Sequence, residues 1–163
     1  MITLKTILVP SDFSECSDAA IRYGLELARR FDAKLHLLHV IRDPATQPWA
    51  AEGLSAAMLE SVEQWQQRAG ARLAASVPAG DAARVTVEVP IAMPYQEILR
   101  YAADHAIDLI VMGTHGRSGV SHILLGSIAE KVVRRAPCPV LTVRHPEREF
   151  VETEPALVTA SAV

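Results

Sequence analysis

A glycine-rich segment in the C-terminal half of the chain has the residue types of an anion-binding loop. Gly113, Gly116 and Gly126 allow the backbone to approach an anion closely, and a helix beginning near Gly126 and Ser127 would direct unpaired N–H groups at it. Arg117 adds a side-chain donor. The segment lacks the closing Gly-Lys-Ser/Thr of a Walker A loop and the glycine spacing of GxGxxG. We expect a phosphate-sized ligand here, although spacing alone is equally compatible with an ordinary strand-to-helix connection.

A carboxylate, Asp12, is the second candidate for ligand binding. It directly follows an apolar, β-branched run at residues 6–10, which is typical of a buried strand. Across a crevice from the glycine-rich segment, its oxygens could accept hydrogen bonds from ribose hydroxyls or an adenine amino group. The alternative is an aspartate that caps its own turn, and the residue type alone does not decide between the two.

The histidines and serines of the chain give weaker signals. His115 and His122 would either contact phosphates or be solvated loop residues. His36 and His39 are three positions apart on a predicted strand, so they point to opposite faces and cannot share a metal ion. The segment from Gly116 onwards misses the G-x-S-x-G nucleophile elbow by one position, which argues against a serine hydrolase.

Strand and helix patterns alternate along the chain, which predicts a parallel sheet with right-handed crossovers. Strands are expected at residues 6–10, 34–40, 84–90, 108–113 and 139–143, and helices at 15–31, 54–73, 94–103 and 127–135. The first and fourth strands are the most apolar and therefore central, whereas the third alternates apolar with polar residues and fits an edge. The result is a three-layer α/β/α domain with a five-stranded parallel sheet of order 3-2-1-4-5.

The strand order reverses between the first and fourth strands, and ligands of open α/β sheets bind at the carboxyl ends that flank such a reversal. Pro10, Ser11 and Asp12 fall there, as does the segment from Gly113 to Gly116. Ser14 is expected to cap the first helix. A stripe of apolar residues at helical spacing predicts the core face of the second helix; it comprises Leu54, Met58, Val62, Trp65, Ala69 and Leu73.

Composition and charge exclude several classes of protein. Half of the 163 residues are hydrophobic and 21% are charged, as in a globular domain. The net charge of −3 equals that of the stretch after His145, with four glutamates and one arginine, so residues 1–145 are formally neutral. A neutral body argues against nucleic acid and membrane surfaces as partners. We expect a cytoplasmic protein because no signal peptide or membrane span is evident. We also expect Cys16 and Cys138 to be buried thiols, because no CxxC motif is present.

Three stretches of the chain form recognisable motifs. They are Ile7-Leu-Val-Pro-Ser-Asp-Phe-Ser-Glu-Cys-Ser17, Leu109-Ile-Val-Met-Gly-Thr-His-Gly116, and Gly126-Ser127 followed by Val132-Val-Arg-Arg-Ala-Pro-Cys-Pro-Val140. Together they resemble the universal stress protein family. The resemblance covers nearly all of residues 4 to 144, so we divide the chain into a universal stress protein domain at 1–145 and a C-terminal tail at 146–163. The spacing Gly113-x2-Gly116-x9-Gly126-Ser127 fits the pattern G-x2-G-x9-G-[S/T] that is associated with the family's ATP-binding members.

The resemblance implies a fold and a set of ligand-binding residues. The fold is the Rossmann-like, adenine nucleotide alpha hydrolase-like sheet of the order given above, and the ligand is ATP with Mg²⁺. Asp12 and Val40 would surround the adenosine, with the backbone of Met112 and Gly113 nearby. The candidate ligand-binding residues are Pro10, Ser11, Asp12, Val40, Met112, Gly113, His115, Gly116, Arg117, Gly126, Ser127 and Ile128. The last of these, from Gly116 on, would follow the triphosphate. One departure is Ala92-Met93-Pro94, where family members often have a glycine.

Two functions remain open at this stage. The first is a homodimeric, nucleotide-dependent stress-response or signalling module, and the second is a slow ATP hydrolase or adenylyl-transfer enzyme that uses the same pocket. No Asp or Glu lies between Gly113 and Gly126 to hold a metal ion near phosphates, so we expect binding without efficient turnover.

The last strand predicts how the chain would dimerise. Its residues Val140, Leu141, Thr142 and Val143 end the sheet with an exposed row of backbone donors and acceptors, which a second copy could pair across a two-fold axis. Family members are similar in dimerising this way. For the tail we expect either disorder or packing on a neighbouring subunit.

Overall fold

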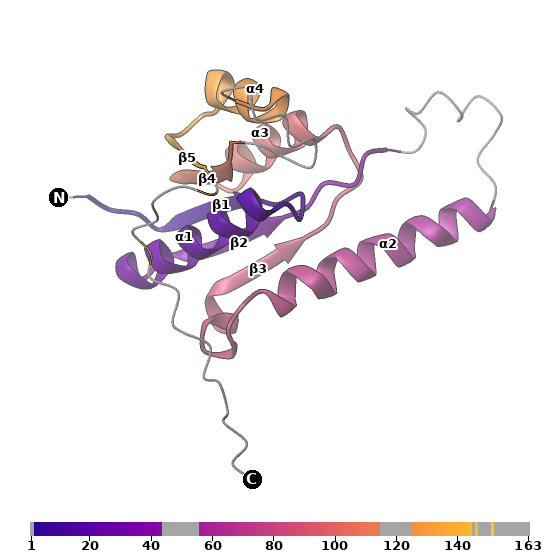
Figure 1. The fold of residues 1–163 in the computed structure, drawn as a ribbon, viewed down its shortest axis with the longest axis horizontal. Coiled ribbons are helices and arrows are strands. Elements are labelled where there is room, and N and C mark those ends of the chain that lie inside the picture. The colour runs from indigo at the N-terminus through magenta and orange to yellow at the C-terminus, as the bar shows by residue number, and fades with distance from the viewer. Residues whose placement is uncertain (1, 44–55, 115–124, 145, 147–150, 152–163) are drawn as a thin grey trace, which may run out of the picture.

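The computed structural model describes residues 2–43, 56–114, 125–144, 146 and 151, without the side chains of residues 56–60 (Figure 1). Strands and helices alternate as predicted. Their order is β1 (Thr6–Pro10), α1 (Glu15–Phe31), β2 (Lys34–Leu38), α2 (Ala56–Ala75), η3 (Ala79–Arg84), β3 (Val85–Glu88), α3 (Pro94–Asp104), β4 (Leu109–Gly113), α4 (Ser127–Arg135) and β5 (Val140–Val143). The short 3-10 helix η3 was not predicted.

The five strands form one parallel sheet of order β3-β2-β1-β4-β5, which confirms the predicted topology. The two most apolar strands, β1 and β4, are neighbours at its centre, and the three middle residues of each are buried. Their pairing begins at Ile7 and Leu109. The chain turns to opposite sides of the sheet after these two strands, so their carboxyl ends flank the reversal where a ligand is expected.

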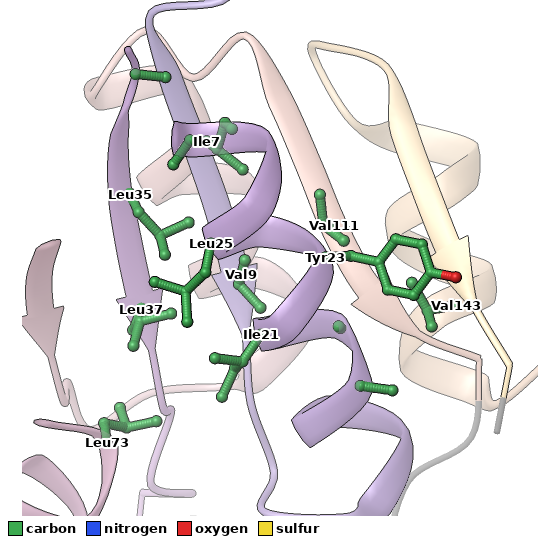
Figure 2. Close-up of a cluster of buried hydrophobic side chains, with 14 residues drawn as sticks. Ile7, Val9, Ile21, Tyr23, Leu25, Leu35, Leu37, Leu73, Val111 and Val143 are labelled. Atoms are coloured by element: carbon green, nitrogen blue, oxygen red, sulfur yellow. The ribbon is translucent and has the colours of Figure 1, made fainter. Parts of the chain in front are cut away.

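Alternate residues of each strand pack against different helices. Ile7 and Val9 belong to a core cluster with α1 and with Leu73 of α2. Figure 2 shows this cluster, with side chains of α1 lying over those of β1, β2 and β4. Leu8, between them, belongs to a second cluster with α3 and α4 on the other face of the sheet, together with Ile110. Helices therefore cover both faces, as the near-continuous apolar strands predicted.

The start and end of α1 follow from its sequence. Ser14 is the N-cap, and its hydroxyl accepts from the backbone N–H of Ser17, as predicted. Asp32 ends the helix in the left-handed region, at φ 51°. The helix lies close to β1 at Gly24, where a Cβ would be 2.5 Å from Cγ2 of Val9, so only glycine allows this approach.

The prediction for α2 was partly wrong. Val62, Ala69 and Leu73 are buried, but Trp65 of the same predicted stripe is 50% exposed. The helix lies along the edge strand β3 and extends beyond its end (Figure 1). Leu54 lies outside the described residues, and the side chain of Met58 is among those not described.

The described part of the predicted tail contacts its own chain. Val151 packs against the core cluster under α1. Packing of the rest of the tail on a neighbouring subunit stays a prediction. Residues 152–163 lie outside the described residues. Among the helices that the structure describes, none is long and apolar enough to cross a membrane.

Candidate functional site

Four segments meet at the carboxyl edge of the sheet, beside the reversal between β1 and β4. The loop after β1 is tied to β2, because the N–H of Ser11 donates to the carbonyl of Leu38 at 2.8 Å. The end of β4 is tied to the start of α4, because the N–H of Gly126 donates to the carbonyl of Thr114 at 2.7 Å. The two ends of the connection between β4 and α4, at Thr114 and Gly126, are therefore adjacent.

Asp12 acts as a turn residue and is also held in one orientation. Its Oδ1 accepts from the N–H of Ser14 at 3.1 Å and from the Ser14 hydroxyl at 2.6 Å. Ser11 beside it is 6% exposed, and its Oγ lies 3.1 Å from that of Ser17. The capping interpretation of Asp12 is therefore confirmed. It does not conflict with ligand binding, because these contacts fix the half-buried carboxylate beside the reversal between β1 and β4.

Sequence reasoning missed Phe13 and His39, which support this loop. Phe13 has φ 63°, a conformation that costs a bulky residue on the order of 1 kcal/mol or more. Nδ1 of His39 donates to the carbonyl of Ser11 at 2.8 Å, and its ring lies 4.4 Å from the Phe13 ring, centroid to centroid. The position of His39 beside Val40, just past β2, was the available signal, whereas nothing in the type of Phe13 predicts a left-handed conformation.

Three of the candidate residues form an apolar wall on the α3 and α4 side of the sheet. Met112 is 5% exposed, and Val40 and Ile128 are partly buried against the same cluster. The neighbouring segment with the unusual Ala92-Met93-Pro94 is tied to this edge, since the N–H of Ala92 donates to the carbonyl of Ile41 at 2.9 Å. An apolar wall of this kind suits the face of a planar base.

Gly113 and Gly126, the two glycines of the motif that the structure describes, have different structural roles. A Cβ on Gly113 would lie 2.8 Å from Cβ of Cys16 and 2.9 Å from its carbonyl carbon, so glycine is needed where β4 passes the first turn of α1. Gly126 is the N-cap of α4 and offers no side-chain cap. The N–H groups of Ser127 and Ile128 in the first turn have no partners within the helix and carry its positive dipole, which favours an anion there.

The candidate residues thus divide into two sets. The structure brings nine of them to one edge of the sheet: Pro10, Ser11, Asp12, Val40, Met112, Gly113, Gly126, Ser127 and Ile128. The other three, His115, Gly116 and Arg117, lie outside the described residues. In the part of the chain that is described, no group of three or more His, Cys, Asp or Glu side chains could hold a metal ion.

His36 lies in a different environment from His39, as expected for two residues that point to opposite faces of a strand. Its Nδ1 lies 2.9 Å from the Tyr101 hydroxyl, and Tyr101 stacks on His105 with ring centroids 3.8 Å apart. Burial lowers the pKa of His36, and the nearby His105 and Lys34 lower it further. Burial, with a smaller effect of Glu88, raises the pKa of Tyr101 to about 12. This cluster joins β2 to α3 and is not part of the crevice.

A parallel sheet that is covered by helices on both faces and reverses its strand order between β1 and β4 defines an α/β domain of the Rossmann-like class. The amino-acid sequence matches the model of the universal stress protein family over residues 3–144. The chain belongs to this family.

Individual relatives agree with this assignment. A universal stress protein of Methanocaldococcus jannaschii is 33% identical over 145 residues, which cover 89% of this chain and 85% of that protein. The structure of a universal stress protein from Lactobacillus plantarum superposes with a TM-score of 0.68 at 30% identity, covering 88% of this chain and all of the other.

Two further solved structures of the same fold contain nucleotides. One is a universal stress protein in complex with cAMP, with a TM-score of 0.61 at 22% identity and coverage of 87% of this chain and 98% of the other. The other, from Archaeoglobus fulgidus, is in complex with dAMP, with a TM-score of 0.56 at 16% identity and coverage of 88% and 99%.

Proposed function

We propose that this protein binds an adenine nucleotide, ATP with Mg²⁺, in the crevice beside β1 and β4, and works as a homodimeric, nucleotide-dependent stress-response or signalling module. The observation that carries the proposal is the meeting of a fixed carboxylate, Asp12, an apolar wall that includes Val40, and the uncapped first turn of α4. Each of these suits a different part of ATP. The nucleotides bound by structural neighbours support the same ligand class.

Each part of the nucleotide has a candidate partner. The carboxylate of Asp12 would accept hydrogen bonds from the adenosine, and Val40 would contact the adenosine from the apolar side. The N–H groups at the start of α4 would donate to phosphate oxygens. Mg²⁺ would enter with the triphosphate, whose oxygens supply the hard ligands that this ion prefers.

The proposed homodimer rests on β5, the edge strand formed by Val140–Val143. The carbonyls of Pro139 and Val143 accept from Ile110 and Thr114 on the β4 side. In a parallel ladder alternate residues bond to opposite sides, so Leu141 also faces β4, whereas Val140 and Thr142 direct their backbone groups away from it. The outer side of β5 therefore presents donors and acceptors that a second copy of the chain can pair.

Mass spectrometry of the nucleotide released from freshly purified protein tests the ligand, and calorimetric titration of Gly126→Val tests the site. Valine tolerates the backbone of Gly126, at φ −67° and ψ 153°, so the domain should fold while its side chain occupies phosphate space. The matched control is Gly80→Val, because a Cβ at Gly80 meets nothing within 4 Å. The proposal is supported if Gly126→Val loses ATP binding and Gly80→Val retains it. Equal ATP affinities of the two variants would refute the site.

A further inference from the structure

The backbone of Phe13 and the orientation of Asp12 belong to one turn. The N–H of Phe13 donates to Oγ of Ser11 at 3.1 Å, and the N–H of Ser14 donates to Oδ1 of Asp12 at 3.1 Å. Phe13 is the middle residue of the turn that the second hydrogen bond closes, so its φ of 63° sets the direction of the Ser14 N–H. If Phe13 leaves the left-handed region, that N–H turns away and the carboxylate of Asp12 loses its orientation.

The ring of Phe13 contacts His39 and Arg72. The His39 ring lies 4.4 Å away, centroid to centroid, and the guanidinium carbon of Arg72 lies 4.3 Å from the centre of the Phe13 ring. A cation at this distance from an aromatic face is attracted to it, and at an exposed site such as Arg72 the attraction changes an equilibrium constant by about two- to fivefold. An unfavourable backbone conformation persists because contacts of this kind outweigh its cost.

Arg72 reaches the turn from the face of the sheet opposite to the apolar wall of the crevice. Phe13 packs against the core cluster under α1, which includes Leu73, the neighbour of Arg72 on α2. Val40, in contrast, packs against the cluster under α3 and α4. An influence of Arg72 on an adenosine beside Val40 therefore passes through Phe13 and the turn that it occupies.

We propose that Arg72 is a positioning residue of the nucleotide site and sets the preference of this site for ATP over bare triphosphate, an inference that rests on the proposed function. By holding the Phe13 ring, Arg72 keeps Asp12 where it accepts hydrogen bonds from the adenosine. Without this contact, a larger fraction of molecules has the turn relaxed, and ATP affinity falls in proportion to the fraction that remains formed. Triphosphate affinity stays the same, because the phosphates are held at the start of α4.

Amide hydrogen exchange of the nucleotide-free, full-length protein, followed by NMR, tests the positioning step without a ligand. Arg72→Gln removes the cation, and exchange at the N–H groups of Phe13 and Ser14 should become about two- to fivefold faster. Arg68→Gln, one turn earlier on α2 and also exposed, is the matched control and should leave both rates unchanged. Equal rates in the two variants would overturn the proposal. If the amides respond but the wild type binds no ATP, the proposed function fails while the positioning of the turn by Arg72 stands.

Calorimetric titration with ATP and Mg²⁺, and with inorganic triphosphate, tests the consequence for binding. Arg72→Gln should weaken ATP binding about two- to fivefold and leave triphosphate binding unchanged. Arg68→Gln should change neither affinity. An equal loss for both ligands in Arg72→Gln would show that Arg72 acts as a charge that attracts phosphate, and would overturn its role in positioning Asp12.

A double-mutant cycle tests whether Phe13 is the link. Glycine adopts a positive φ without strain and has no ring for Arg72 to contact. In the Phe13→Gly background, Arg72→Gln should therefore change neither the ATP affinity nor the exchange rate at Ser14. A loss as large as the one in the wild-type background would mean that Arg72 acts by another route, which contradicts the proposal. Thermal unfolding checks that each variant is folded.

Discussion

Nδ1 of His39 donates to the carbonyl oxygen of Ser11 at 2.8 Å, and this hydrogen bond joins the end of β2 to the loop that carries Asp12. The backbone N–H of His39 also continues the ladder to β3, by donating to Glu88 at 3.0 Å. The edge of the crevice is therefore held together by a side chain that sequence reasoning did not include in the site. The contribution of this hydrogen bond to stability can be measured separately from that of the ring packing of His39 on Phe13.

Replacing His39 by phenylalanine should remove the hydrogen bond and retain ring packing on Phe13. We expect the free energy of unfolding to fall by about 1 kcal/mol, because the Ser11 carbonyl loses its donor. ATP affinity should fall as well, since the loop holding Asp12 is less restrained. Urea unfolding and calorimetric titration measure the two effects, and an unchanged stability would show that the hydrogen bond contributes nothing.

Gly113→Ala should destabilise the domain by about 1–3 kcal/mol, the usual cost of forcing an atom into a packed interior. The new methyl group would lie 2.8–2.9 Å from atoms of Cys16, one of which is backbone and cannot rotate away. Gly80→Ala is the control, because nothing lies within 4 Å of a Cβ there. Unfolding in urea distinguishes them, and equal stability of both variants would contradict the close packing of β4 on α1.

The stability of the protein should fall on acidification through His36. Its pKa lies below the ordinary 6.5 because of burial first, and of His105 and Lys34 second. As pH falls through 6.5 towards the lowered pKa, the unfolded chain binds the proton more readily than the folded protein does, so the free energy of unfolding decreases. His36→Gln removes this titration while retaining a polar group for the Tyr101 hydroxyl.

Urea unfolding of the wild type and His36→Gln at about pH 7.5 and about pH 5.5, on either side of the ordinary histidine value, measures this effect. The variant should lose less stability between the two conditions. If both proteins lose the same amount, the acid sensitivity arises elsewhere.

Much of the fold was predictable because it depends on local patterns. The burial of β1 and β4 follows from their continuous apolar runs, and the start of α1 from Ser14. Trp65 was mispredicted because periodicity groups apolar residues on one helix face without showing which of them the rest of the protein covers. Coverage depends on the placement of α2 beside β3, which only the folded structure fixes.

The positions of the candidate residues were predictable, but the contacts that support them were not. Asp12 was placed by the end of the first strand, and Val40 and Ile128 by the family resemblance; all three lie at the same edge of the sheet. Phe13 was not predictable, because its left-handed backbone is maintained by contacts with His39 and Arg72, which are 26 and 59 positions away in the sequence. Such contacts between distant segments leave no periodic or spacing signal.

Thr142→Pro should dissociate the proposed dimer without disturbing the sheet. The backbone N–H of Thr142 lies on the side of β5 that faces away from β4, so proline removes a donor needed only between subunits, at a position that edge strands tolerate. Thr142→Val, which keeps the N–H, is the control. Sedimentation equilibrium should show a dimer for the wild type and the control and a monomer for the proline variant. A wild type that is monomeric at all concentrations would contradict the dimer.

The central claim is tested most directly by calorimetric titration of ATP with Mg²⁺, and of inorganic triphosphate, into the wild type and Asp12→Asn. Asparagine retains an oxygen for the two hydrogen bonds from Ser14 but loses the carboxylate. The wild type should bind ATP, and the variant should bind it at least about tenfold more weakly, with triphosphate affinity unchanged. Absence of ATP binding by the wild type, or an equal loss for both ligands in the variant, would contradict the account.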